Sequence, residues 1–458
     1  MKYPPFTVQK ILFGNKIRTV KSLGKPYWYL RLPWLQQCRP ASGGDPLTKD
    51  YDVIIVGAGH NGLVASAYLQ MAGLQTLVLE RRHIIGGQQS QKKSFQKRGL
   101  KVYTRPHFAF TPLLEEPGQN GRPRSLLLGK DHESTYQQIA KFLKKMQRCL
   151  NLVEVAFPEY EKYIAKLGEA IEPLLDMSPV DIQSLTEGTL RKRLKALPAL
   201  RTLMQTGLAL GKDIPAFYEI LTAPAKKILD RWFDSEPLKA TIATDAVIGA
   251  MLTPDQPGSG YVLLHHVMGQ IDGEKGAWGF VEGGMGSVSR CISEAALEHG
   301  ATILTNKTVS SLLSDSDKKV CGVVLEDGTE IRSKAVLSNA TLSNGREWDE
   351  ETKKAYADIV FDAVEQYAPG FKDSIVGADI LPPPELERIF GLTGGNIFHG
   401  ALSLDQLYLA RPYPWCSSYR TPVKGLYLCG SGAHPGGGVM GAPGYNSAQI
   451  VKTDFAAM

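Results

Sequence analysis

Residues 51–62 are Tyr-Asp-Val-Ile-Ile-Val-Gly-Ala-Gly-His-Asn-Gly, and this stretch decides the fold of the chain. Its apolar first half predicts a buried strand, and the residues that follow it have the pattern of a helix. Gly57 permits a tight turn, Gly59 lets a pyrophosphate approach the backbone, and Gly62 lets the helix lie close to the strand. The free N–H groups at the helix start would face phosphates, so the stretch predicts a dinucleotide-binding βαβ unit.

The next apolar run, 76–79, predicts the second strand of this unit and ends in Glu80, 18 residues after Gly62. A carboxylate at that place accepts hydrogen bonds from the ribose hydroxyls of an adenine dinucleotide. We therefore expect the following residues to bind the dinucleotide: Gly57, Ala58, Gly59, Asn61, Gly62 and Glu80.

The length and composition predict a globular protein of two domains. The chain has 458 residues, of which 43% are hydrophobic and 21% are charged. A single hydrophobic core rarely serves a chain of this length. No run of about 18 apolar residues lacks charge, so we expect no transmembrane span.

The basic excess of the chain lies entirely in residues 1–44. This segment carries eight Lys and Arg side chains and no acidic one, while the remainder has 44 basic and 46 acidic residues, a net charge of −2. The balance of the remainder argues against a nucleic-acid surface. An acid-free, basic N-terminus predicts a mitochondrial transit peptide and a matrix location, with a disordered basic tail as the alternative.

The six cysteines contain no CxxC pair and no closely spaced pair. Their spacing therefore supports neither a dithiol redox centre nor a metal site, and we expect all six to be structural. The adjacent pair His265–His266 is also expected to be structural, because neighbouring side chains on a helix diverge. We predict no metal and name no catalytic residue.

The fold class predicted is α/β, a Rossmann-type nucleotide-binding domain with a discontinuous, largely helical second domain. Helical periodicity, punctuated by prolines, begins near residue 134 and ends near 255. The predicted segments are 1–44, targeting or disordered; 51–133, nucleotide-binding; 134–255, helical cap and substrate part; 256–342, nucleotide-binding; 343–415, residual substrate part; and 416–458, nucleotide-binding.

Three separated segments point to a family. The first continues from Glu80 through Arg81 to the pair Gly86-Gly87; the second is the glycine turn 283–286 with a hairpin at 322–328; the third is the glycine-rich run 426–441. Together they resemble the carotenoid and retinoid oxidoreductases, the phytoene-desaturase-like family of FAD enzymes. The resemblance covers nearly the whole chain after the N-terminus.

The resemblance implies FAD as the cofactor and adds further contact residues. Glycines after the acidic residue distinguish FAD proteins of this family from plain NAD proteins. The turn 436–438 would let backbone lie flat against a flavin ring, with the helix start behind it facing the edge that gathers negative charge. The added residues are Arg81, Gly86, Gly87, Val309, Gly430 and Gly441, while His434 is expected to be fixed by loop hydrogen bonds rather than to act as an acid or base.

The chain departs from the family pattern in two places. A polar stretch, 88–93, follows Gly87, and the sequence passes from Leu342 to Trp348 where relatives have on the order of a hundred further residues, about a small domain. We interpret the chain as a shortened isoform or as the product of an imperfect gene model, and for a genuine short chain we expect weakened stability and little turnover.

The function predicted is a mitochondrial FAD-dependent oxidoreductase acting on an apolar, isoprenoid-like substrate. The alternative is a non-catalytic flavin-fold protein that regulates mitochondrial function through a respiratory-chain partner. A plain NAD dehydrogenase fits the third segment less well, and a disulfide reductase lacks its cysteine pair.

Overall fold

The computed structural model describes residues 45–85, 98–117, 123–143, 150–271, 274–340, 348–438 and 440–457. The basic segment 1–44, the pair Gly86-Gly87 with the polar stretch after it, and the junction at 341–347 lie outside these residues. The predictions made for them stay predictions.

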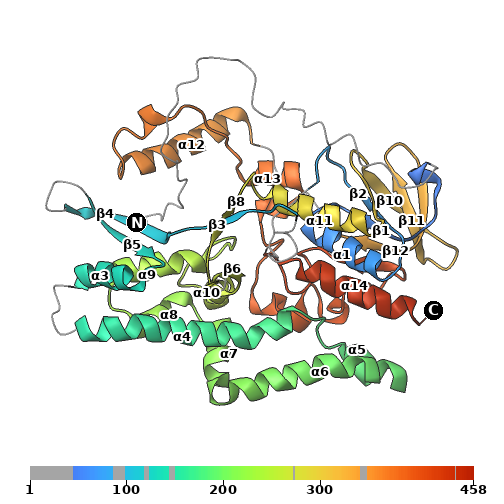
Figure 1. The fold of residues 1–458 in the computed structure, drawn as a ribbon, viewed down its shortest axis with the longest axis horizontal. Coiled ribbons are helices and arrows are strands. Elements are labelled where there is room, and N and C mark those ends of the chain that lie inside the picture. Colours follow the sequence, from blue (N-terminus) through green and yellow to red (C-terminus); the bar gives the residue numbers. More distant parts are fainter. Residues whose placement is uncertain are drawn as a thin grey trace.

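A seven-stranded sheet organises the nucleotide-binding part, drawn on the right of Figure 1. Five strands are parallel, in the order β13-β12-β1-β2-β9. Two more, β10 and β11, extend the sheet as an antiparallel meander from the first residues of β12. The bounds are β1 Tyr51–Val56, β2 Thr76–Leu79, β9 Thr302–Leu304, β10 Val309–Ser314, β11 Val320–Leu325, β12 Glu330–Ser338 and β13 Leu426–Leu428.

Three helices cover one face of this sheet: α1 (His60–Met71), α11 (Gly286–Glu298) and α14 (Ala442–Phe455). Val53 and Val78 point into the core that they share with these helices, while Ile54 and Leu77 belong to the core under the meander. Burial on both faces explains why the strands are continuous apolar runs. The α/β fold class and the Rossmann-type unit expected from the sequence are confirmed.

The second part is largely helical; in Figure 1 it fills the lower left and extends along the bottom to the lower right. Phe157, Ile164 and Leu229 are among the residues of its separate hydrophobic core. Its helices are α3 His132–Leu143, α4 Leu150–Leu175, α5 Ile182–Thr186, α6 Leu190–Leu210, α7 Ile214–Thr222, α8 Ala225–Trp232, α9 Glu236–Ala243 and α10 Ser259–Val267.

Two predicted nucleotide-binding segments contribute elements to the helical part instead. The hairpin of β4 (His107–Pro117) and β5 (Pro123–Gly129) places Leu126 and Leu128 in the helical core, and α10 does the same with Leu263 and Leu264. Their apolar side chains gave no sign of which core they would join. Two short two-stranded sheets follow. One pairs β3 Val102–Thr104 with β8 Gly279–Val281, and its Val102 and Val281 pack against the core of the nucleotide-binding part; the other pairs β6 Gln270–Ile271 with β7 Glu274–Lys275.

Residues 348–425 add two helices, α12 (Glu350–Glu365) and α13 (Pro383–Phe390). Short 3-10 turns occur at Pro46–Thr48, Gly211–Asp213, Thr244–Ala246, Lys372–Ser374, Thr393–Gly395, Leu404–Gln406, Tyr408–Ala410 and Pro414–Cys416. Within the described residues, no helix has both the length and the apolar character needed to cross a membrane.

Candidate cofactor site

The glycine turn after β1 has the backbone geometry that phosphate binding requires. Gly57 has a φ of +98°, in the left-handed region that favours glycine. Helix α1 begins at His60 with Gly59 as its N-cap, and no side chain caps its first N–H groups. A helix start with uncapped N–H groups and a positive dipole end is suited to bind an anion.

The remaining glycines of the turn are required by close approaches. A Cβ on Gly62 would lie 2.3 Å from the carbonyl oxygen of Gly57, and a Cβ on Gly59 would lie 2.8 Å from Nδ2 of Asn339. Asn339 directly follows β12 and donates to the carbonyl oxygen of Gly57 at 3.3 Å. The sequence analysis missed this residue, although a polar side chain at the carboxyl end of a central strand was a usable signal.

Glu80 lies at the carboxyl end of β2 and is only 5% exposed. Its carboxylate accepts the N–H of Ala58 at 2.9 Å and both the backbone N–H and Nε–H of Arg82, at 3.0 and 3.2 Å. A carboxylate has about four acceptor positions, so one remains for a ribose hydroxyl. Arg81 instead reaches the carbonyls of Arg388 and Ile389 at α13, both at 3.4 Å.

The segment that leads into Val309, one of the expected contact residues, lies beside Glu80. The carbonyl oxygen of Glu80 accepts the N–H of Lys307 at 2.9 Å, and Val309 begins β10 two residues later. The structure therefore brings Val309 to the same edge of the sheet as the carboxylate.

The third segment returns to the first turn from the end of β13. The side-chain amide of Asn61 donates to the hydroxyl of Ser431 at 3.1 Å, and a Cβ on Gly430 would lie 2.9 Å from Oδ1 of Asn339. Gly441, with a φ of +69°, is the N-cap of α14, which also lacks a side-chain cap. Two uncapped helix starts thus come from opposite ends of the chain.

The glycine turn 436–438 is packed against residues of the loop after α13. A Cβ on Gly436 would lie 2.7 Å from Cδ2 of Leu402, and a Cβ on Gly437 would lie 2.3 Å from Cα of Phe398. A Cβ on Gly438 would lie 3.0 Å from Nε2 of His265. Close packing therefore favours glycine at these three positions, in addition to the expected contact with the flavin ring.

Several buried polar atoms of this region lack a partner among the described residues. They are His60 Nε2, Asn61 Oδ1, His265 Nδ1, His399 Nδ1, His434 Nδ1 and Ser447 Oγ. Buried polar atoms are nearly always hydrogen-bonded in native proteins, so a polar ligand is expected among them. With the uncapped helix starts and the free acceptor position of Glu80, the residues present fit a dinucleotide cofactor.

The histidines of the site are neutral because burial lowers their pKa values. The pKa is lowered to about 4 for His60 and His434, and to about 3 for His265. Nε2 of His434 is held by the carbonyl oxygen of Leu174 at 2.7 Å, which supports the structural role expected for it. The rings of His265 and His266 are inclined by 79°, and no metal-binding cluster occurs within the described residues.

Arg411 is a buried cation that the sequence analysis missed. It is 1% exposed and donates to the carbonyl oxygens of Ser431, Phe398, His399 and Ala401, at 2.8 to 3.3 Å. Burial lowers its pKa to about 10, so the guanidinium stays charged at neutral pH. It fixes the loop 398–401 against the turn after β13, a contact that no local pattern reveals.

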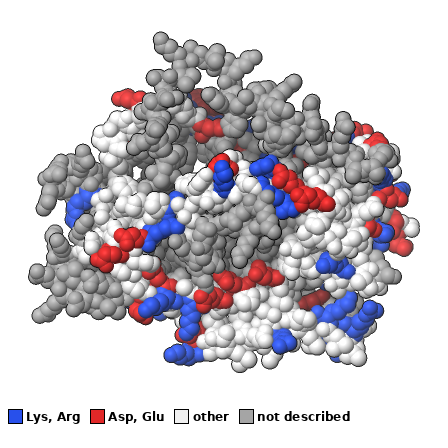
Figure 2. All heavy atoms as spheres, viewed as in Figure 1, with Lys and Arg blue, Asp and Glu red and all other residues white. Residues whose placement is uncertain are grey.

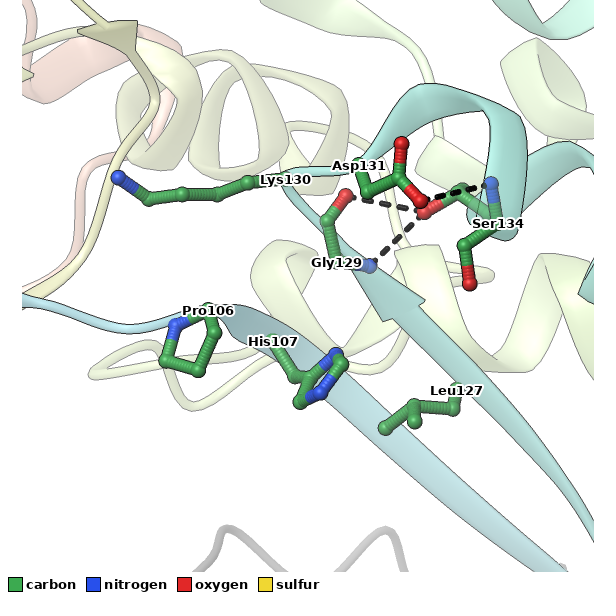
Figure 3. A pocket seen from close by; sticks show the side chains of 8 residues that line it. Pro106, His107, Leu127, Gly129, Lys130, Asp131 and Ser134 are labelled. Atoms are coloured by element: carbon green, nitrogen blue, oxygen red, sulfur yellow. Dashed lines mark hydrogen bonds between the residues drawn. The ribbon is translucent and has the colours of Figure 1, made fainter.

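A small cavity of about 240 Å³ lies away from this site, at the end of the β4–β5 hairpin (Figure 3). Several of its polar groups are already paired: the N–H of Gly129 donates to Oγ1 of Thr135 at 2.9 Å, and Asp131 accepts the N–H of Ser134 at 3.2 Å. We assign it no role.

The fold and the site define an FAD-dependent oxidoreductase, and comparison with known proteins agrees. The sequence profile of the flavin-containing amine oxidoreductases matches residues 62–367, and the chain belongs to this family. FAD is its cofactor, as the sequence predicts.

The chain is similar to "pyridine nucleotide-disulfide oxidoreductase domain-containing protein 2" of Rattus norvegicus, with 42% identity over 92% of this chain and 96% of that protein. That alignment spans 567 positions, whereas 92% of 458 residues is about 421, so about 146 positions have no counterpart here. The difference agrees with the internal gaps that the sequence predicts.

Two more distant relatives cover most of the chain. One component of the limonene dehydrogenase of Castellaniella defragrans is 21% identical over 89% of this chain and 95% of its own. The solved structure of a putrescine oxidase variant superposes with a TM-score of 0.52 at 14% identity, covering 89% of this chain and 99% of the oxidase. At that identity the likeness shows the fold alone.

Proposed function

We propose that this FAD-dependent oxidoreductase removes hydride from a neutral, apolar, isoprenoid-like substrate. The observation that carries the proposal is the set of side chains around the turn 436–438. An added Cβ would meet Leu402, Arg411, Phe398, His265 and Met440 there, and none of these is a carboxylate.

An ammonium substrate would meet a repulsive field at this place. Arg411 carries a buried positive charge, and His265 is neutral, so neither side chain offers a negative charge to an ammonium group. A half-buried carboxylate of the helical part, Asp245, interacts with Arg105 instead, and desolvation raises its pKa to about 6. Burying an unpaired ammonium beside a cation is costly, whereas a hydrocarbon loses nothing there.

An apolar cluster continues from the turn into the helical part. We call it the flavin-side cluster; its buried members are Ile171, Leu174, Leu175, Tyr261, Val262, Phe398 and Leu402. It gives an apolar substrate a matching surface and excludes water from the reacting carbon. The flavin, when bound, supplies the hydride acceptor. Loss of hydride would leave a carbocation, which becomes an alkene when an adjacent carbon releases a proton to the solvent. The chain's residues bind and orient the substrate, and no side chain is assigned as the base.

The name of one relative that covers most of the chain also supports an apolar substrate. The limonene dehydrogenase component is named for limonene and aligns over 89% of this chain.

The mitochondrial matrix is proposed as the location, on the basis of the basic, acid-free segment 1–44.

Anaerobic mixing of the FAD-loaded chain with candidate substrates tests the proposal. We expect limonene or a carotene in detergent to bleach the flavin absorbance, and putrescine to leave it unchanged. The Gly59→Asp variant, which places a carboxylate where the phosphates bind, is the control and should lose the flavin altogether. Bleaching by putrescine and not by the hydrocarbons would refute the apolar assignment.

The internal gaps favour a second candidate, a flavin-fold protein that acts through a respiratory-chain partner. About 146 aligned positions of the rat relative are missing from this chain. If capture of respiratory components is unchanged by Gly59→Asp while no substrate bleaches the flavin, this second function replaces the first. Equal loss of both would tie the function to FAD.

A further inference from the structure

Helix α6 exposes an apolar stripe on the side opposite the one that it packs against the protein. We call it the outer stripe; its members and exposed fractions are Leu190 75%, Leu194 56%, Leu197 46%, Met204 61% and Leu208 80%. Their separations of four, three, seven and four residues keep them on one side of an α-helix. Apolar side chains this exposed, in one row that only Arg201 interrupts, mark a surface that is covered in function.

The opposite side of α6 accounts for the contact with the rest of the protein. Ala196, Ala199, Thr206 and Leu210 are buried there, and α6 lies against α4, α5 and α7. The outer stripe is therefore not needed to hold the helix in place.

The charged residues of α6 are all positive. Arg191, Arg193, Lys195 and Arg201 are exposed, and the 21 residues of α6 include no Asp or Glu. In Figure 1 the first half of α6 lies along the lower right edge, where Figure 2 shows Lys and Arg side chains among uncharged ones. Leucines flanked by basic residues are typical of a helix that lies in a membrane interface.

We propose that α6 docks the protein on an anionic lipid surface, with the outer stripe among the acyl chains and the basic residues at the headgroups. A second copy of the chain fits the same surface less well. A two-fold contact would place α6 against α6, and Arg201, in line with the stripe, would face like charges.

The inner side of α6 connects this surface to the site. Leu203 packs against the flavin-side cluster, whose Phe398 touches the turn at Gly437. A docked α6 would thus hold that cluster close to the lipid phase, in which an apolar substrate dissolves. This last step rests on the proposed function, whereas the docking itself does not.

Flotation of the FAD-loaded full chain with vesicles tests the docking. We expect the protein to float with phosphatidylcholine vesicles that contain phosphatidylglycerol, and to bind them less as salt is raised. Failure to float with these vesicles at low salt would overturn the proposal.

Variants locate the contact. The triple variant Leu190→Ser/Leu194→Ser/Leu208→Ser should lower vesicle partitioning at least about tenfold. Arg191→Gln/Arg201→Gln should weaken binding about tenfold and reduce the preference for anionic lipid. Met251→Ser and Val376→Ser, at side chains 88% and 100% exposed on other segments, are the matched controls and should change nothing. Equal losses in the controls would overturn the assignment to α6.

Controls for folding and for dimer formation accompany the flotation. The flavin absorbance and Tm of the variants should match those of the wild type. If the triple variant fails to fold, Leu208→Ser alone replaces it, and we expect that change to lower vesicle partitioning several-fold. If gel filtration without lipid shows a dimer that the Leu→Ser changes dissociate, the stripe covers a second copy and the docking is refuted. If vesicles bind but no hydrocarbon bleaches the flavin, the proposed function fails and the docking stands.

Discussion

The side-chain amide of Asn61 donates a 3.1 Å hydrogen bond to the hydroxyl oxygen of Ser431, 370 residues further along the chain. Both residues are buried, one in the first glycine turn and the other in the last glycine-rich segment. Asn446 of α14 also reaches the helical part, because its amide donates to the carbonyl oxygen of Leu175 at 3.0 Å. The cofactor site is therefore complete only when both ends of the chain and the helical part have come together.

Gly444→Ala should separate the two helix starts. A Cβ on Gly444 would lie 2.0 Å from the carbonyl oxygen of Asn61, which is backbone and cannot move alone. We expect the free energy of unfolding to fall by about 1–3 kcal/mol and FAD to dissociate more readily. Urea denaturation and flavin absorbance measure the two effects. Gly432→Ala, where a Cβ meets nothing within 4 Å, is the control and should be close to neutral.

Glu80→Gln should weaken FAD binding without unfolding the protein. The amide keeps the shape of the carboxylate but loses the charge that accepts hydrogen bonds from Ala58 and Arg82, and that we expect to accept one from a ribose hydroxyl. Hydrogen bonds to a charged group contribute about 1.5–3 kcal/mol, so we expect the Kd for FAD to rise at least about tenfold. Titration of the apoprotein with FAD measures it, against the exposed change Glu326→Gln. An unchanged Kd would remove Glu80 from the ribose site.

The βαβ unit could be predicted from the sequence because its determinants are local. They all lie within about 30 residues: the apolar run 51–56, the glycines that follow it, and β2, whose successive side chains pack alternately into the two cores on either face of the sheet. The strands at 302–304, 309–314 and 426–428 follow from the same short-range rules. These rules predict each strand and the residue at which it ends. The cofactor site lies at the carboxyl ends of the parallel strands, so the predicted strand ends also locate part of the site.

The rest of the site depends on contacts between residues distant in the sequence. Asn339 lies near four glycines of two segments, and Arg411 joins a loop to the turn after β13. The β4–β5 hairpin belongs to the helical core because Leu126 and Leu128 pack against residues of that core. The alternation of apolar and polar residues along a strand does not tell which core its apolar face will join. Local patterns carry no information on such pairings.

Arg411→Met should cost about 3 kcal/mol or more of the free energy of unfolding. The apolar replacement fills similar space but leaves the carbonyl oxygens of Ser431, Phe398 and Ala401 buried without their donor. Chemical denaturation measures the loss, and the exposed change Arg332→Met should stay within about 0.5 kcal/mol of wild type. A loss no larger than that of the control would show that these carbonyls find other partners.

Stability should fall as the pH is lowered through the range below 6.5. Burial lowers the pKa of His434 to about 4, whereas the unfolded chain has its ordinary value of 6.5. Between these values the unfolded chain binds the additional proton, so the stabilisation is complete above about pH 6.5 and is lost as the pH falls toward 4. His60, His399 and His265 change in the same direction for the same reason, burial being the largest cause for each.

One variant isolates the contribution of His434 to this dependence. Each such proton contributes up to about 1.4 kcal/mol per pH unit to the slope of the unfolding free energy. His434→Gln keeps a group able to reach the carbonyl oxygen of Leu174 but cannot be protonated, so the slope between pH 6.5 and 4 should fall by up to that amount. Urea denaturation across this range measures the slope for both proteins. His83→Gln, at an exposed position, is the control and should leave it unchanged. An equal slope in wild type and His434→Gln would mean that the His434 ring has the same pKa in the folded and the unfolded protein.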